Sequence, residues 1–168
     1  MNKYPVSMVL FHWLLAALMI ATLLVGWQLD DNEALLGLHR SLGVLVLGLA
    51  LLRLVNRVLR RAAIPPSLNP AGSLPHTAEK LVHLGLYVCM IAVPLLGWLK
   101  TNAGGHAVEC FGVTLPTLMG HNPTLSHLLG PAHSLLASGF AVLLVAHVGG
   151  AVFHMLMHKV NILRRISP

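Results

Sequence analysis

Two histidines, His133 and His147, lie fourteen positions apart in a long stretch without any acidic or basic residue of the Asp, Glu, Lys or Arg type. On an α-helix this spacing is a rise of about 21 Å and an angular offset of about 40°, so both rings face nearly the same way at two depths. Ionisable groups inside a bilayer are costly and usually functional. If the stretch spans a membrane, one imidazole lies near each surface and each needs its own partner.

The composition indicates a membrane protein. Of 168 residues, 56% are hydrophobic and only 10% are charged, whereas soluble domains carry about 25% charged residues. Eleven histidines outnumber the five acidic residues. The two cysteines form no disulfide framework or metal-binding pattern, and the chain has no Cys-x-x-Cys-His motif for covalent haem attachment.

Four long apolar stretches predict an all-α fold, a bundle of four transmembrane helices in a single integral membrane domain of residues 1–168. The expected helices cover residues 6–29, 35–58, 77–99 and 125–158, and each reaches the roughly 20 residues that a bilayer requires. The first is too long for the apolar part of a signal peptide and lacks a small-residue cleavage site. The prolines at 65, 66, 70 and 75 predict a non-helical loop, the piece 111–116 is expected along the membrane surface, and no internal repeat is apparent.

The basic residues predict the orientation. Four spans place both termini on one side, and nine of the eleven Lys and Arg residues fall there: Lys3, Arg53, Arg57, Arg60, Arg61, Lys80, Lys159, Arg164 and Arg165. Only Arg40 and Lys100 fall on the other side. The positive-inside rule then puts both termini in the cytoplasm, and this explains the basic balance without any binding to nucleic acid.

With this orientation, four histidines fall at two matched depths. His12 and His147 lie near the inner surface, whereas His39 and His133 lie near the outer one. The residue four positions after each is small, which leaves space on the same helix face for a large flat group: Ala16, Ala151, Gly43 and Ala137.

A pair of facing imidazoles suits haem iron. Zinc needs about four ligands, whereas haem iron takes axial histidines and its macrocycle fills the other positions. Cofactor sites in bundles are built from side chains on facing helices. The pattern therefore predicts two non-covalent b-type haems with bis-histidine ligation, an inner one at His12 and His147 and an outer one at His39 and His133.

Two arginines are candidates for binding the haem propionates. Arg53 lies fourteen residues after His39 and so reaches the inner depth on the same face. A buried arginine needs an anion, which a propionate supplies, and Arg40, with Lys100, can serve the outer haem in the same way. The alternative is that Arg53 extends to the cytoplasmic surface as an ordinary long side chain.

His83 leaves one assignment open. It lies at the inner depth on the third helix and can replace His12 or His147 as a ligand. The remaining histidines in or near the two connections are expected to be solvated: His76 in the inner loop, and His106, His121 and His127 in or near the outer one.

Several ordered motifs resemble the small bacterial cytochrome b-561 family of inner-membrane di-haem cytochromes. They are Phe11-His12-Trp13, His39-Arg40-Ser41-Leu42-Gly43, Arg53-Leu54-Val55-Asn56-Arg57, His83-Leu84-Gly85-Leu86-Tyr87, Pro94-Leu95-Leu96-Gly97-Trp98, Phe111-Gly112 to Pro116, and the His133 and His147 pair. The resemblance covers nearly the whole chain. It implies that the four haem ligands are the residues matching His12, His39, His133 and His147.

The resemblance also implies a function. Members carry electrons to and from quinones, and one type is a superoxide oxidase, an oxidoreductase that takes electrons from superoxide on the periplasmic side and passes them to ubiquinone near the cytoplasmic side. By that analogy His154, and with it His158, lies where quinone docks beyond the inner haem. His154 follows His147 by seven positions and so shares its helix face.

Two other functions are possible alternatives. The first uses the same four histidines as haem ligands, and the second uses none of them as ligands. One is a non-catalytic cytochrome b subunit that carries electrons between quinol and a periplasmic redox partner. The other is a structural or transport bundle without haem. The outer side holds four acidic residues against two basic ones, so its composition displays no basic funnel for an anionic substrate.

Overall fold

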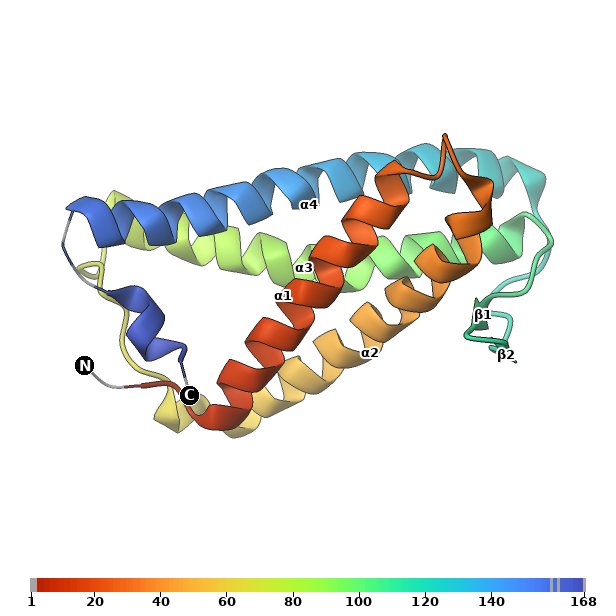
Figure 1. The fold of residues 1–168 in the computed structure, drawn as a ribbon. Helices are drawn as coiled ribbons and strands as arrows, with labels where there is room; N and C mark the ends of the chain where they lie inside the picture. The colour runs from red at the N-terminus through yellow and green to blue at the C-terminus, as the bar shows by residue number, and fades with distance from the viewer. Residues whose placement is uncertain (1–2, 158, 160, 168) are drawn as a thin grey trace.

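The computed structural model describes residues 3–157, 159 and 161–167, and four long helices dominate them (Figure 1). The helices are α1 (Val6–Trp27), α2 (Leu36–Leu59), α3 (Leu74–Ala103) and α4 (Pro123–Met157). All four are long and apolar enough to cross a membrane, which confirms the predicted fold class. The short elements are η1 (Glu33–Leu35), η2 (Arg61–Ala63), β1 (Glu109–Cys110), β2 (Val113–Thr114) and η3 (Ile162–Arg165).

Helix α3 begins earlier than the sequence predicts. The Ser73 hydroxyl caps it by accepting a hydrogen bond from the backbone N–H of His76 at 3.3 Å. Pro75 lies in the first turn, where the missing N–H costs nothing because that turn has no intrahelical acceptor for it. The prediction that Pro75 belongs to a non-helical loop was therefore wrong.

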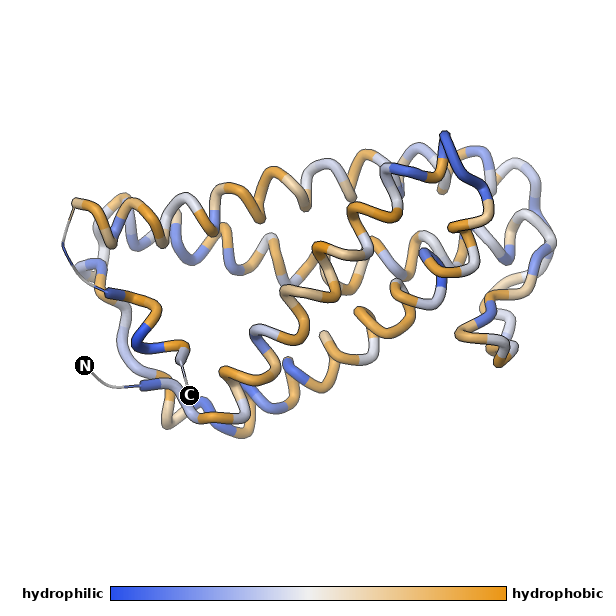
Figure 2. The backbone as a smooth tube through the Cα atoms, viewed as in Figure 1, coloured by the Kyte–Doolittle hydropathy of each residue, from blue (hydrophilic) through white to orange (hydrophobic). Residues whose placement is uncertain are grey.

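The helices are arranged as two hairpins. Helices α3 and α4 run beside each other, and the hairpin of α1 and α2 crosses them at an angle (Figure 1). Both ends of the chain lie at one end of the bundle, called here the inner end, and the β-hairpin lies at the opposite, outer end. Hydrophilic residues gather at the turns and at the two ends, whereas the helix bodies are mainly hydrophobic (Figure 2).

The outer faces of the helices suit contact with lipid, while a small apolar core holds their inner faces together. Large side chains such as Leu10 and Leu14 are 59% and 57% exposed, which in water would leave an aggregation-prone surface. The core draws on all four helices and consists of Leu15, Met19, Val46, Ala50, Leu86, Cys89, Met90 and Phe140. Phe140 is seven residues from both His133 and His147, so this core separates the two depths at which those histidines lie.

The connection between α3 and α4 contains a β-hairpin that the sequence did not predict. Its two strands pair antiparallel, with Glu109 opposite Thr114. The backbone N–H of Phe111 donates to the Ser41 hydroxyl at 2.9 Å, which fastens the hairpin to α2. Phe111 and Gly112 both have positive φ, of 48° and 83°, as a tight hairpin turn of this kind requires.

At the inner end, the C-terminal segment containing η3 extends from α4 to the start of α1 (Figure 1). The indole N–H of Trp13 donates to the backbone carbonyl of Ile166 at 2.8 Å. The backbone N–H of Tyr4 donates to the carbonyl of Arg165 at 3.0 Å, and the Arg165 guanidinium donates to the carbonyl of Pro66 at 2.8 Å. These contacts tie the inner ends of the two hairpins together.

Candidate functional site

The outer pair of histidines faces across the bundle. His39 comes from α2 and His133 from α4, and their ring centroids lie 6.1 Å apart with an angle of 86° between the planes. Both side chains are half-buried. The two residues predicted to share the outer depth therefore meet in the structure.

The inner pair repeats this spacing. His12 comes from α1 and His147 from α4, and their ring centroids are also 6.1 Å apart, at 63°. Imidazole nitrogen lies about 2 Å from a bound metal, so two rings that coordinate one ion from opposite sides have centres about 6 Å apart. Both pairs thus have the separation that axial ligation of one haem iron needs.

The outer rings are held in the tautomer that a metal ligand requires. The Nδ1–H of His39 donates to the carbonyl of Thr22 at 3.2 Å, and the Nδ1–H of His133 donates to the carbonyl of Val93 at 2.9 Å. A carbonyl only accepts, so each neutral ring keeps its proton at Nδ1 and leaves the Nε2 lone pair free for a metal.

A cavity lies between the outer histidines. Residues of all four helices line it, and it is partly open to the outside. Gly43 and Ala137, the small residues four positions after His39 and His133, are part of the lining, and the rest is mainly apolar. The lining of the outer site, two facing imidazoles among small and apolar side chains, therefore suits an apolar cofactor that carries a metal ion.

Arg53 gives the inner site a different arrangement. Its Nη1 and Nη2 atoms each lie 3.2 Å from Nδ1 of His12, and its Nε–H donates to the Tyr87 hydroxyl at 3.3 Å. A guanidinium only donates, so Nδ1 of His12 accepts and the ring proton sits at Nε2. Coordination of a metal through Nε2 would require the opposite tautomer, with the proton at Nδ1, where the Arg53 guanidinium now lies.

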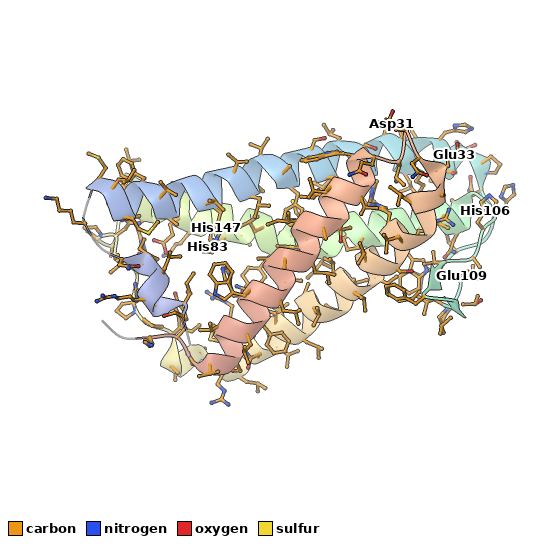
Figure 3. The ribbon with its side chains drawn as sticks, in the orientation of Figure 1. Asp31, Glu33, His83, His106, Glu109 and His147 are labelled. Carbon is orange, nitrogen blue, oxygen red and sulfur yellow. The ribbon has the colours of Figure 1, made fainter. Side chains whose placement is uncertain are left out.

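His83 lies closer to His147 than His12 does. The ring centroids of His83 and His147 are 5.0 Å apart, and Figure 3 shows the two side chains near each other in the inner half of the bundle. This separation is about 1 Å too short for two rings on opposite sides of one metal. The Nδ1–H of His83 donates to the backbone carbonyl of Glu79 at 2.7 Å, so its ring is held from its own helix.

The remaining predicted residues are spread along the two ends. Arg40 and Lys100 both lie close enough to His39 for their charges to act on its ring, and Lys100 also acts on His133. His154 is half-buried near the end of α4, while His158 lies outside the described residues.

Four groups that hold the side chains of these sites were not predicted from the sequence. The main-chain carbonyls of Thr22, Val93 and Glu79 hold the histidine rings, but a carbonyl leaves no signal in residue type. The Tyr87 hydroxyl holds Arg53, and its place four residues after His83 on one helix face was the available signal.

Among the described residues, no three or more His, Cys, Asp or Glu side chains are grouped so that they could hold a metal ion by themselves.

Four helices able to cross a membrane surround two pairs of facing imidazoles at two depths, an arrangement that suits a membrane-bound cytochrome b. The chain belongs to the prokaryotic cytochrome b561 family, which it matches over residues 3–168. It is a multi-pass protein of the bacterial inner membrane, and the family implies b-type haem and electron transfer.

Curated relatives agree with this assignment over nearly their full length. The chain is 27% identical to cytochrome b561 homolog 1 of Escherichia coli (strain K12), covering 100% of this chain and 98% of that protein. It is 28% identical to cytochrome b561 homolog 2 of the same organism, covering 98% and 91%. It is also 24% identical to the probable superoxide oxidase CybB of Yersinia pestis, covering 99% and 97%.

Proposed function

We propose that this cytochrome binds two haems, one between His39 and His133 and one between His12 and His147, and that electrons pass from superoxide at the outer side to ubiquinone at the inner side. The observation that carries the proposal is the equal 6.1 Å separation of the two stacked imidazole pairs. Helix α4 contributes one proposed ligand to each pair, so the two sites have this helix in common.

The residues of the chain position and isolate the redox groups. Haem, when bound, supplies an iron that gains and loses one electron. His39 and His133 present Nε2 because backbone carbonyls hold their Nδ1–H groups. The apolar core between the two depths, with Phe140 only 4% exposed, excludes water from the space between the sites. At the inner site Arg53 contacts His12, and a haem propionate would give its guanidinium an anionic partner.

Two features support superoxide as the electron donor. Lys100 lies near both outer histidines, where a cation attracts an anionic substrate. One relative with full-length coverage carries the name probable superoxide oxidase. In the proposed reaction each of two superoxide ions gives up one electron and becomes O₂, and one ubiquinone takes both electrons with two protons from the inner side.

Purified protein mixed with a superoxide source and ubiquinone tests the proposal. We expect one ubiquinol for every two superoxide ions consumed, without any added protein partner. The control is the same protein after the haem has been extracted. Superoxide decay that proceeds at the same rate with and without the haem-containing protein would rule out the superoxide reaction.

The outer face favours a second candidate function, a cytochrome subunit that exchanges electrons with a periplasmic redox protein. Asp31, Glu33 and Glu109 lie at the outer end in Figure 3, all are exposed, and such a face suits a basic protein partner. Ubiquinol that reduces both haems, together with no reaction with superoxide, would be the result expected for this carrier.

His154→Ala is expected to keep both haems and slow ubiquinone reduction by about tenfold or more, because general acid–base groups typically contribute 10²–10⁴-fold. Stopped-flow reoxidation of the dithionite-reduced protein by ubiquinone measures the rate. His127→Ala, which removes an exposed histidine near the outer end of the same helix, is the matched control. A His154→Ala protein that lacks one haem would contradict the proposed quinone role.

A further inference from the structure

Helices α1 and α3 carry a sequence repeat, so the expectation that the chain has no internal repeat was wrong. Residues 11–27 and 82–98 align at an offset of 71 without gaps, and eight of these seventeen positions are identical. The identical pairs are His12 and His83, Leu15 and Leu86, Met19 and Met90, Ile20 and Ile91, Ala21 and Ala92, Leu24 and Leu95, Gly26 and Gly97, and Trp27 and Trp98. Both helices run from the inner end to the outer end (Figure 1).

Helices α2 and α4 align in the same way at an offset of 94. His39 then corresponds to His133, and Arg53 corresponds to His147. Identity is lower here, so the correspondence depends on the structure: the two hairpins, α1 with α2 and α3 with α4, each begin at the inner end and return to it (Figure 1).

The residues that line the outer cavity correspond in space as they do in the alignment of the two hairpins. Of the thirteen described residues that line it, twelve form six pairs at these two offsets, and Cys89 is the one outside them. Three pairs come from α1 and α3: Met19 and Met90, Thr22 and Val93, and Leu23 and Pro94. Three come from α2 and α4: His39 and His133, Gly43 and Ala137, and Val46 and Phe140.

The supports of the two outer histidines correspond as well. His39 donates to the carbonyl of Thr22, and His133 donates to the carbonyl of Val93, its counterpart in the repeat. One turn further along each helix stands a glycine against the same ring. A Cβ on Gly26 would lie 2.8 Å from Cε1 of His39, and a Cβ on Gly97 would lie 3.1 Å from Cε1 of His133.

We propose that the outer haem site consists of two equivalent half-sites, one in each helical hairpin, and that Gly26 and Gly97 are their positioning residues. Each half-site has a histidine on one helix, and a carbonyl with a glycine four residues later on the helix before it. The carbonyl fixes the tautomer of the ring, and the bare glycine backbone lets the ring reach that carbonyl. The inference rests on the proposed bis-histidine ligation of the outer haem.

The inner site departs from this equivalence. The counterpart of His12 is His83, and the counterpart of ligand His147 is Arg53. Within the first hairpin Arg53 contacts His12, and within the second His147 contacts His83. His12 and His147 are therefore not counterparts of each other in the repeat. His83, the counterpart of His12, is the third histidine at the inner site.

Glycine-to-alanine variants of the full-length, haem-loaded protein test the half-sites. Carbon atoms in contact lie about 3.5–4.0 Å apart, so Gly26→Ala must displace His39 further than Gly97→Ala displaces His133. We expect Gly26→Ala to lose the outer haem from at least about half of the molecules. We expect Gly97→Ala to retain it with altered low-spin EPR g-values and midpoint potential. The inner haem, retained in the same sample, reports that each variant has folded.

Gly48→Ala on α2 and Gly139→Ala on α4 are the matched controls, because among the described residues a Cβ at either position would meet no heavy atom within 4 Å apart from its chain neighbours and the backbone of its own helix turn. Both are expected to keep two haems with unchanged g-values and potentials. Wild-type outer-haem content, g-values and potential in both Gly26→Ala and Gly97→Ala would overturn the inference, and so would equal changes in the controls. A wild-type protein without any haem would overturn the proposed function itself, which separates the two failures.

Discussion

Replacing His39 with alanine is expected to remove the outer haem and leave the inner haem in place. His39 is one of two facing ligands at the outer site, and its loss leaves His133 alone beside a mainly apolar cavity. A single axial histidine holds a non-covalent haem less strongly than two, so the haem-to-protein ratio should fall from about two to about one. The inner pair is at the other depth of the bundle and shares no side chain with the outer pair.

A pyridine haemochrome assay with a protein determination measures this ratio, and low-temperature EPR identifies the remaining haem. His106→Ala is the matched control, because it removes an exposed histidine at the outer end. A His39→Ala protein with two bis-histidine haems would show that the outer pair is assigned wrongly.

The second large effect is expected at the inner site. His147→Ala should lose the inner haem and keep the outer one, whereas His83→Ala should keep both. His147 and His12 have the 6.1 Å spacing that fits a metal between them, but His83 and His147 are only 5.0 Å apart. The expected change is again from about two haems to about one in His147→Ala.

His12→Ala completes this comparison and should also lose the inner haem. If His83→Ala loses the inner haem while His12→Ala keeps it, His83 is the ligand and the assigned inner pair is wrong. Arg53→Gln tests the same site in another way: if a propionate becomes the partner of Arg53, the variant should keep the haem but lower its midpoint potential, because a nearby positive charge that favours the reduced iron is lost.

The sequence by itself determined the membrane-spanning architecture. A bilayer forces each spanning segment to satisfy its own backbone hydrogen bonds and to present apolar side chains over a fixed thickness. These two requirements apply to each segment separately, so the apolar residues 6–29 predict α1 without information from any other helix. The observed start of α3 differs from the predicted one because the Ser73 side chain caps the helix and Pro75 is tolerated in its first turn.

The depth of each histidine also followed from the sequence, because rise per residue is constant along a helix. This is why the spacing from His133 to His147 was enough to predict two levels. Depth does not determine which helix faces meet, however. His83 shares its depth with His12, and only the ring separations distinguish the two as facing partners of His147.

Only the tertiary structure decided how each ring is held. The groups that orient His39 and His133 are main-chain carbonyls of neighbouring helices, and every residue type has the same carbonyl. The clearance at Gly26 and Gly97 depends on interhelical distance, which no single segment encodes. The identities between residues 11–27 and 82–98 are in the sequence, whereas the correspondence of α2 with α4 depends on the residues that they contribute to the outer cavity. The orientation of each histidine ring depends on contacts between helices. The length, the polarity and the depth of a segment depend on that one helix alone.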